Sequence, residues 1–345
     1  MKLFQSQLGY EYLGNWEEED NSNIEESEVR KYLTSAGYSE GLIVRTLEKL
    51  RTTATNYSES LYTNNKNFYT LLRYGVGVIE NVGEATQRVH IIDWEHPEKN
   101  HFAIAEEVTI QGNREKRPDI VLYINGIAIG VLELKRSIVS IGDGIRQSIV
   151  NQQKEFIQSF FSTIQIVFAG NDTEGLKYGT IGTPEKYFLT WKEDEDDHST
   201  FQMDKYLMKM CDKKRLLDIL HDFVLFDGGI KKLPRTHQYL GIKSAQEFIR
   251  RKEGGIIWHT QGSGKSLFMV WLAKWILENN ANARVVILTD RIELDKQIER
   301  VFHDAGETDM KRTTSGRDLM KQLSSSRPRL LCSLVHKFGT RDGEN

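Results

Sequence analysis

The chain has few of the features that would connect it with secretion or with a membrane. Its 345 residues include two cysteines, Cys211 and Cys332, far apart and with no His or Cys partner at metal-ligand spacing. Neither a disulfide framework nor a zinc site is therefore indicated. No stretch approaches the roughly 20 apolar residues of a membrane span, and the N-terminus lacks the apolar core of an export signal. These absences predict a cytoplasmic protein without membrane contact.

An excess of positive charge is also missing. The formal net charge is −3, so any contact with DNA has to come from local basic clusters and not from a global attraction. A solvated face is the simpler explanation of each short basic group in the chain. These groups are Arg114–Arg117, Lys213–Arg215, Lys231–Lys232 and Arg250–Lys252.

The first part of the chain has the pattern of an α/β domain. Capping residues and apolar periodicity predict helices over residues 23–36 and 40–54. Short Val, Ile and aromatic runs broken by glycine favour strands over residues 68–108. A helix over residues 144–156 and a strand over residues 164–169 follow. Mixed strands with a helix laid across them predict the α/β class.

An acidic run, Lys192–His198, predicts a solvated linker. It divides the chain into a first domain, residues 1–195, and a second domain, residues 196–345. In the second domain strands alternate with helices, which predicts a parallel, doubly wound sheet. The predicted helices cover residues 203–226, 265–279 and 292–302, and the predicted strands cover residues 256–258, 284–289 and 330–335.

A glycine-rich segment between the predicted strand 256–258 and the predicted helix 265–279 has the pattern of a phosphate-binding loop. Gly262 and Gly264 allow backbone N–H groups to approach phosphate oxygens, and the helix N-terminus adds partial positive charge. Lys265 would neutralise the β- and γ-phosphates of ATP, and Ser266 would bind Mg²⁺. His259 stands where the general motif has Gly or Ala. The predicted ATP site comprises Thr260, Gln261, Gly262, Ser263, Gly264, Lys265 and Ser266; an incidental glycine loop is the alternative.

Two further segments resemble motifs of superfamily 2 helicases. Arg235-Thr236-His237-Gln238 is similar to their glutamine element, and this resemblance implies that Gln238 recognises adenine. Val285–Arg291 is similar to the next motif, in which a strand ends in a loop that touches the DNA backbone. Together with the phosphate loop, these segments indicate a helicase-like motor.

Three charged residues interrupt the apolar segment Arg117–Lys135, namely Asp119, Glu133 and Lys135. Burying a charge without a partner is costly, so a tight set among core residues implies mutual pairing or a bound cation. With both carboxylates on one face, Mg²⁺ could bind between them and polarise a phosphodiester, while Lys135 helps to orient or deprotonate the attacking water and offsets developing charge. A structural ion-pair network remains the alternative.

The metal site requires a specific offset between two strands. A two-residue Asn125-Gly126 hairpin would pair Asp119 with Leu132 and turn Glu133 to the opposite face. A three-residue loop, or an equivalent bulge, places Asp119 across from Glu133, with Val121 and Val131 on the same face. We predict this second register.

The Pro-Asp...Glu-X-Lys pattern at Pro118, Asp119, Glu133 and Lys135 resembles the signature of metal-dependent nucleases. Nearly the whole chain resembles the N-terminal part of the restriction subunit of type I restriction-modification enzymes. The matching segments are Asn23–Ser27, Gly170–Gly175, Tyr178–Thr180 and Trp258–Ser266.

This resemblance implies a restriction-endonuclease-like mixed sheet with helices, followed by the first RecA-like domain of a motor with a parallel sheet. It implies Mg²⁺ and ATP as cofactors, double-stranded DNA as substrate, and methyltransferase and specificity subunits as partners. It also implies that Gln147, in a Gln-X-X-X-Tyr motif, supports the nuclease site. Asn151 occupies the Tyr position here.

The remaining motor motifs are expected beyond Val335–Gly339, so the residues present should bind ATP but scarcely hydrolyse it. We therefore expect a piece of a longer subunit. Two other functions stay open. One is a superfamily 2 repair helicase whose Asp-Glu-Lys cluster is only structural, and the other is a catalytically silent assembly module.

Overall fold

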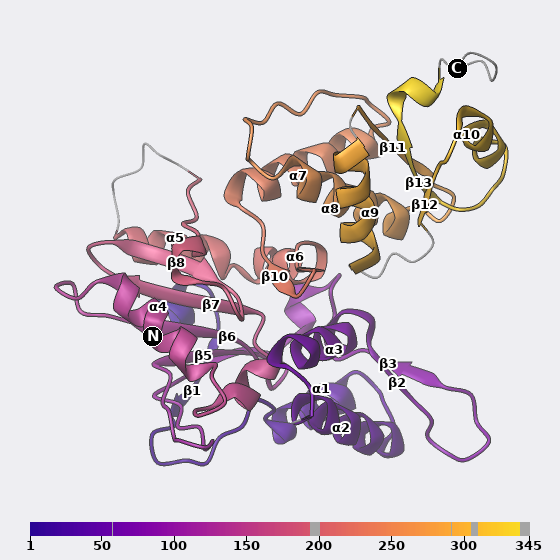
Figure 1. The fold of residues 1–345 in the computed structure, drawn as a ribbon. Helices are drawn as coiled ribbons and strands as arrows, with labels where there is room; N and C mark the ends of the chain where they lie inside the picture. Colours follow the sequence, from indigo (N-terminus) through magenta and orange to yellow (C-terminus); the bar gives the residue numbers. More distant parts are fainter. Residues whose placement is uncertain (57, 194–200, 291, 305–309, 339–345) are drawn as a thin grey trace. The chain divides into compact units, whose positions relative to one another are not determined.

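The computed structural model describes residues 1–56, 58–193, 201–290, 292–304 and 310–338 (Figure 1). The chain forms two compact units, one made of residues 1–224 and 230–233 and the other of residues 225–229 and 234 onward. The division falls at residues 224–234 and not at residue 195, because helix α5 (Gln202–Met210) packs against strand β8 (Gly175–Gly179) of the first unit. Most of the acidic run lies outside the described residues.

A six-stranded mixed sheet organises the first unit, in the order β1-β4-β5-β6-β7-β8. β1 is parallel to β4 and β6 is parallel to β7, whereas the other neighbours are antiparallel. The α/β class with a mixed sheet is therefore confirmed. Besides β8, its strands are β1 (Glu11–Asn15), β4 (Phe102–Glu106), β5 (Ile120–Ile124), β6 (Ile127–Leu134) and β7 (Ile166–Asn171).

Helices and short strands complete the first unit. The helices besides α5 are α1 (Glu26–Ser35), α2 (Glu40–Ala54), α3 (Leu61–Tyr74), α4 (Ile141–Asn151) and α6 (Lys213–Asp222). A small hairpin of β2 (Val76–Val78) and β3 (Gln87–Val89) pairs antiparallel, and β10 (Ile230–Lys232) also belongs to this unit. A π-helix covers Leu3–Gln7, and 3-10 turns cover Pro97–Lys99, Gln158–Ser162 and Glu185–Tyr187.

Some predicted boundaries were wrong, for local reasons. Residues 68–74 are the end of α3 and not a strand, because the Ser60 side chain caps a helix whose buried residues recur with helical spacing. The single helix predicted over residues 203–226 is two helices, since Asp212 caps α6 by accepting from the N–H of Arg215 at 3.0 Å. α4 begins at Ile141 and ends at Asn151, five residues before the predicted end at Phe156.

The core of the first unit lies between the sheet and α4. Val121 of β5 and Val131 of β6 are fully buried in one cluster with Ile141 and Ile145 of α4. The apolar face of α4 therefore covers the centre of the sheet, and β5 and β6 are buried on both faces. The predicted placement of Val121 and Val131 on a common face is confirmed.

The second unit contains a three-stranded sheet in the order β11-β13-β12, parallel throughout, which confirms the parallel sheet. Its strands are β11 (Val285–Thr289), β12 (Met310–Arg312) and β13 (Leu330–Leu334), and β9 (Leu225–Asp227) also belongs to this unit. Its helices are α7 (Thr236–Arg250), α8 (Lys265–Asn279), α9 (Ile292–Asp304) and α10 (Gly316–Leu323), with a 3-10 turn over Val335–Phe338. No helix of the described residues is long and apolar enough to cross a membrane.

The predicted buried strand at residues 256–258 is absent. The segment has no regular structure, and Ile256 and Trp258 are 91% and 90% exposed. A strand needs a neighbour to accept its hydrogen bonds, and no strand of the described residues pairs with this segment.

Gly126 at the β5–β6 turn provides a test of the fold. Its φ is +80°, and an added Cβ would lie 2.6 Å from the carbonyl oxygen of Glu25 and 2.8 Å from the amide of Val29. We expect Gly126→Ala to lower the free energy of unfolding by roughly 2 kcal/mol or more, measured by urea denaturation. Gly182→Ala is the matched control, since Gly182 also has positive φ (+66°) but nothing within 4 Å. Equal losses in the two variants would contradict the role of the close approach.

Candidate functional site

The connection between β5 and β6 is a two-residue turn. Asn125 and Gly126 both have positive φ, 50° and 80°, as a tight hairpin turn requires. Ile124 pairs with Ile127 on either side of it. The predicted three-residue loop is therefore wrong.

A bulge in β6 nevertheless produces the predicted offset. Tyr123 pairs with Ala128, but Leu122 pairs with Gly130, so Ile129 is an extra residue in β6. Beyond this bulge Ile120 pairs with Leu132, and the next residues outward are Asp119 and Glu133. The equivalent bulge that we predicted is confirmed, and it brings the two carboxylates to one place on one face of the sheet.

Hydrogen bonds join the predicted residues into one network. Asp119 Oδ2 accepts from the backbone N–H of Leu134 at 2.6 Å. Gln147 of α4 donates through Nε2 to Glu133 Oε2 at 2.7 Å and accepts through Oε1 from Lys135 Nζ at 2.8 Å. The amide of Gln147 thus lies between the carboxylate and the ammonium group.

Glu133 is fully buried, and burial raises the pKa of its carboxyl group to about 8. The negative charge of Asp119 acts in the same direction as burial, and the positive charge of Lys135 only partly opposes them. Glu133 Oε1 has no hydrogen-bond partner among the described residues. A buried carboxylate oxygen without a partner is unfavourable unless a proton or a cation binds there.

These oxygens fit a magnesium ion. Mg²⁺ takes hard oxygen ligands and usually keeps several waters, so it is bound through one or two carboxylates. Asp119 and Glu133 supply two carboxylates, and the orphaned Oε1 of Glu133 supplies a ligand atom. Within the described ranges no group of three or more His, Cys, Asp or Glu residues could hold a metal ion.

The inner face of α4 carries further polar groups. Asn151 lies one turn after Gln147 and is 1% exposed, yet neither its Oδ1 nor its Nδ2 has a partner in the described structure. The buried hydroxyl of Ser148 also has no hydrogen-bond partner in the described structure. The structure thus places Asn151 in the core beneath the site and leaves the role of the family Tyr at this position untested.

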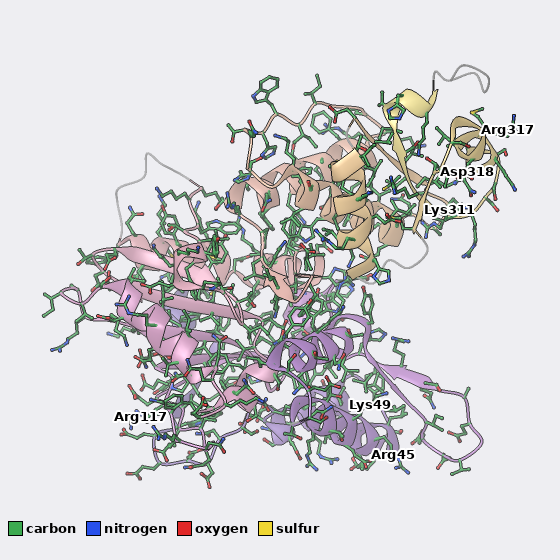
Figure 2. All side chains as sticks on the ribbon, viewed as in Figure 1. Arg45, Lys49, Arg117, Lys311, Arg317 and Asp318 are labelled. Carbon is green, nitrogen blue, oxygen red and sulfur yellow. The ribbon has the colours of Figure 1, made fainter. Side chains whose placement is uncertain are left out.

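One acidic residue near the site was missed. Glu107, directly after β4, has a φ of 49°, and its backbone N–H donates to the carbonyl of Asp119 at 2.9 Å. Arg117 (Figure 2) forms ion pairs with both Glu107 and Glu17, so this part of the basic group 114–117 is compensated. The positive φ of Glu107 could not be predicted from the sequence, because glutamate rarely adopts this backbone conformation.

The phosphate loop of the second unit has the expected backbone. Gly262 and Gly264 have φ values of 77° and 87°, and Gly264 is the N-cap of α8. Lys265 Nζ donates to the carbonyls of His259 at 3.2 Å and Thr260 at 3.0 Å. The lysine therefore folds back over the loop, at the place where phosphates would accept the same N–H groups.

Gln238 of α7 contacts the phosphate loop directly. Its Nε2 donates to the carbonyls of Ser263 at 3.1 Å and Gly264 at 3.2 Å, and its Oε1 accepts from the N–H of Arg235 at 2.8 Å. Gly264 has a φ of +87°, so any other residue would be strained there, and an added Cβ would also displace Gln238 Nε2, which lies 2.4 Å from its position. To recognise adenine, the Gln238 side-chain amide would have to exchange these hydrogen bonds for hydrogen bonds to the base.

The histidine at the unusual loop position packs against two rings. His259 lies 5.1 Å from His237 and 5.4 Å from Phe268 between ring centroids. Burial, with the nearby charges of His237 and Lys265, lowers the pKa of His259.

The structure brings Gln238, the loop glycines and Lys265 together, with Ser266 in the first turn of α8, while Thr260 and Gln261 are exposed. Arg291, the last residue of the segment that resembles the next helicase motif, lies outside the described residues.

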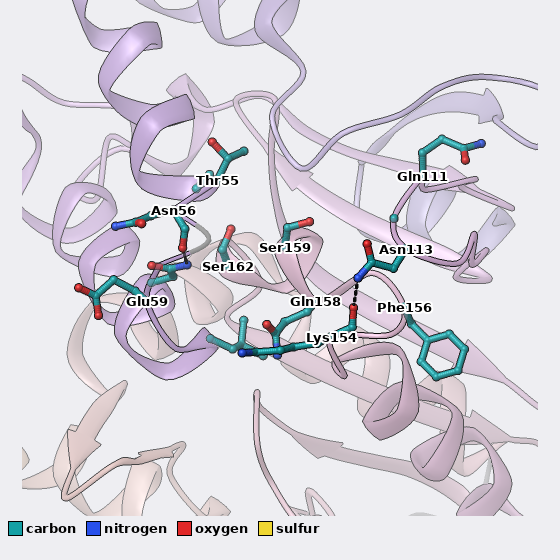
Figure 3. Close-up of a pocket in the computed structure, with 14 residues that line it drawn as sticks. Thr55, Asn56, Glu59, Gln111, Asn113, Lys154, Phe156, Gln158, Ser159 and Ser162 are labelled. Atoms are coloured by element: carbon teal, nitrogen blue, oxygen red, sulfur yellow. Dashed lines mark hydrogen bonds between the residues drawn. The ribbon is translucent and has the colours of Figure 1, made fainter.

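A separate pocket of about 450 Å³ occurs in the first unit (Figure 3). Its lining is mostly polar and includes Asn56 and Glu59 of the connection between α2 and α3, and Lys154 and Gln158 of the segment after α4. None of the predicted site residues lines it. The network of Asp119, Glu133, Lys135 and Gln147 instead lies at one end of the central strands β5 and β6, where Glu133 is buried and Lys135 is partly exposed.

Comparisons with known proteins agree with both halves of the chain. Residues 1–186 match the family model "Type I restriction enzyme R protein N terminus", and residues 237–345 match the SWI2/SNF2 ATPase model. The chain is 29% identical to a putative type I restriction enzyme MjaIXP endonuclease subunit of Methanocaldococcus jannaschii over 85% of this chain and 32% of that protein. It is 30% identical to the type I restriction enzyme HindI endonuclease subunit of Haemophilus influenzae over 76% of this chain and 26% of that protein. The chain thus spans about a third or less of the length of these relatives.

Stability should depend on pH through Glu133. Its pKa is raised on folding, so its stabilising effect is present below the unfolded pKa near 4.5 and is lost as the pH rises to about 8. Without divalent metal, Glu133→Gln should leave stability nearly unchanged at pH 4.5 and raise it at pH 8, because each pKa unit corresponds to ~1.4 kcal/mol. Thermal unfolding across this pH range measures the difference. A constant difference would contradict the perturbed carboxyl group.

Proposed function

Because the chain belongs to the type I restriction enzyme R protein family through its N-terminal region, we propose that it is part of the endonuclease and ATP-dependent translocase subunit of a type I restriction system. The proposed reaction is Mg²⁺-assisted hydrolysis of phosphodiester bonds in double-stranded DNA. Methyltransferase and specificity subunits are the proposed partners, and the cytoplasm is the proposed location. Because the chain spans only part of its relatives, these activities are proposed for the whole protein.

The connection of Glu133 and Lys135 through an amide is the observation that carries the nuclease proposal. In a structural ion-pair network the ammonium group would neutralise a carboxylate directly. Among the described residues no ion pair joins Lys135 to Asp119 or Glu133, and the Gln147 amide lies between Glu133 and Lys135. The buried Glu133 carboxyl group and the half-buried Asp119 carboxylate are therefore only partly compensated by Lys135, which supports a cation site.

The side chains have distinct roles in this proposal. Mg²⁺, when bound, would polarise the phosphodiester and an attacking water. Asp119 and Glu133 would hold the ion, with Glu133 in its ionised form. Lys135 stays on the same face, oriented by the Gln147 amide, and offsets the charge that develops on the phosphate. Val121 and Val131 form dry walls that strengthen these electrostatic interactions.

ATP binding is proposed for the second unit. Gly262 and Gly264 open the backbone to phosphate oxygens, and α8 directs its N-terminus to the same place. Lys265 would transfer its N–H groups from the loop carbonyls to the β- and γ-phosphates, and Ser266 would bind Mg²⁺. Gln238 is the proposed adenine-recognising residue.

Removal of the metal ligands or of the lysine tests the nuclease proposal. In the native protein assembled with its partner subunits, Asp119→Ala and Lys135→Ala should each lower DNA cleavage at least 100-fold, since each removes a charge that acts in the transition state. ATP hydrolysis should be retained. Plasmid nicking and linearisation, together with phosphate release, measure the two activities.

Glu155→Ala is the matched control, because Glu155 is an exposed carboxylate of the same unit outside the network. Normal cutting by both site variants, with ATPase retained, would favour a repair helicase with a structural cluster. An assembled complex of the unmodified protein that cuts no DNA would favour a silent assembly module.

Lys265 provides an independent test of the motor unit. Lys265→Ala should weaken ATP binding by about tenfold or more, because one charge-assisted contact to the phosphates is lost. Titration with a fluorescent ATP analogue measures this affinity, with Lys321→Ala of α10 as an exposed lysine control. Unchanged affinity in Lys265→Ala would show that the glycine loop is incidental.

A further inference from the structure

The turn between β6 and α4 follows directly after the metal-site residues. Residues 136–140 connect Lys135, at the end of β6, to the helix that carries Gln147. A backbone hydrogen bond from the N–H of Val139 to the carbonyl of Arg136, at 2.8 Å, closes the turn on itself. Because the turn lies beside the catalytic network, a molecule that binds at the network also contacts the surface of the turn.

Three side chains of the β7–β8 connection hold this turn. Asn171 donates through Nδ2 to the carbonyl of Val139 at 2.8 Å, and Thr173 donates through Oγ1 to the carbonyl of Ser137 at 2.9 Å. Glu174 accepts through Oε1 from the N–H of Ile141 at 2.9 Å. These residues belong to the segment Gly170–Gly175, which the sequence linked to the family without a role.

Asn171 is itself fixed by its surroundings. It is 1% exposed, and its Oδ1 accepts from the N–H groups of Thr173 at 3.1 Å and Glu174 at 2.6 Å. The backbone N–H of Lys135 also donates to the carbonyl of Gly170 at 2.9 Å. The same connection therefore orders the catalytic lysine and the turn that follows it.

The clamped turn presents a cation and an apolar side chain to solvent. Arg136 is exposed and has no ion-pair partner among the residues that the structure describes. Ile138 is 88% exposed. Single exposed apolar residues are common, but this one stands on a turn whose backbone is fixed by three side chains, so it cannot readily fold inward.

We propose that residues 136–140 form a rigid contact for double-stranded DNA beside the scissile phosphate. Arg136 contacts a neighbouring backbone phosphate, and Ile138 packs against the sugars and base edges of the minor groove, where proteins often insert apolar side chains. This inference rests on the proposed nuclease function, because it places the DNA at Asp119, Glu133 and Lys135.

The charges around the turn favour DNA over a protein partner. Asp143 and Glu185, on the adjacent α4 and the turn after β8, both pair with Arg146, and Glu174 is committed to the backbone of Ile141. Arg136 has no ion-pair partner among the described residues, and the exposed carboxylates of the β7–β8 connection are those of Asp172 and Glu174. A phosphate needs such a cation, and the apolar neighbour fits the sugar that adjoins it.

Binding measurements on the native protein test the contact. A fluorescent DNA duplex is titrated at several NaCl concentrations without divalent metal, so that no cleavage is required. Arg136→Ala should reduce the slope of log affinity against log salt by about one. Ile138→Ser should weaken binding by roughly tenfold with little change in this slope. Val82→Ser is the matched control, since Val82 is equally exposed in the loop between β2 and β3.

The clamp is tested through the steady-state cleavage kinetics. Thr173→Val removes the hydroxyl donor to Ser137 at nearly constant volume and should raise the KM for DNA about fivefold or more with a smaller change in kcat. Thr173→Ser keeps the donor and should restore the KM. A merely structural role would lower the thermal midpoint in both variants without this split.

Binding by Arg136→Ala and Ile138→Ser that equals the unmodified protein would overturn the proposal. Loss of subunit assembly in Ile138→Ser with unchanged DNA binding would also overturn it, and would assign the turn to a protein partner. Failure of the proposed nuclease function is a different result: Asp119→Ala and Lys135→Ala would then cut normally, whatever the binding titrations show.

Discussion

The burial of one carboxylate opposite another is the constraint on which the first unit depends. Glu133 lies in the core between the sheet and α4, and Asp119 faces it from the neighbouring strand. The cost of ionising Glu133 there is large, which is why its pKa is raised to about 8. Such an arrangement lowers stability unless a proton or a cation compensates it. The buried Glu133 carboxyl group is therefore both the centre of the candidate binding site and a source of instability in the core.

The rest of the network follows from this buried group. The amide of Gln147 satisfies one oxygen of Glu133 and holds the ammonium group of Lys135. α4 packs on the sheet at Gly144, where an added Cβ would lie at ordinary contact distance, 3.4 Å from Ala169 Cβ and 3.5 Å from Glu133 Cβ. The turn between Lys135 and α4 is held by Asn171, Thr173 and Glu174. Rigid neighbours thus position each group around the carboxylates.

Sequence patterns predicted much of this architecture, and their failures have physical reasons. The α/β class, the parallel second sheet and the grouping of Asp119 with Glu133 were confirmed. Aromatic residues favour strands, so the sequence pattern predicts a strand at residues 68–74. In the structure these residues end helix α3, and Phe68, Tyr69 and Leu72 have the spacing of one helix face. The apolar residues 256–258 form no strand, since pairing depends on a partner segment and not on composition.

By itself the sequence determined which chemical groups this protein carries and their order along the chain. It supplied the two carboxylates, the lysine, the glycine loop and the glutamine, because periodicity and turn residues specify local structure. Only the tertiary structure decided that Ile129 is the bulged residue, that Gln147 separates Glu133 from Lys135, and that Asn171 and Thr173 hold the turn at residues 136–140. These contacts join residues distant in sequence, and their formation depends on how α4 and β7 pack on β6, which no local pattern encodes.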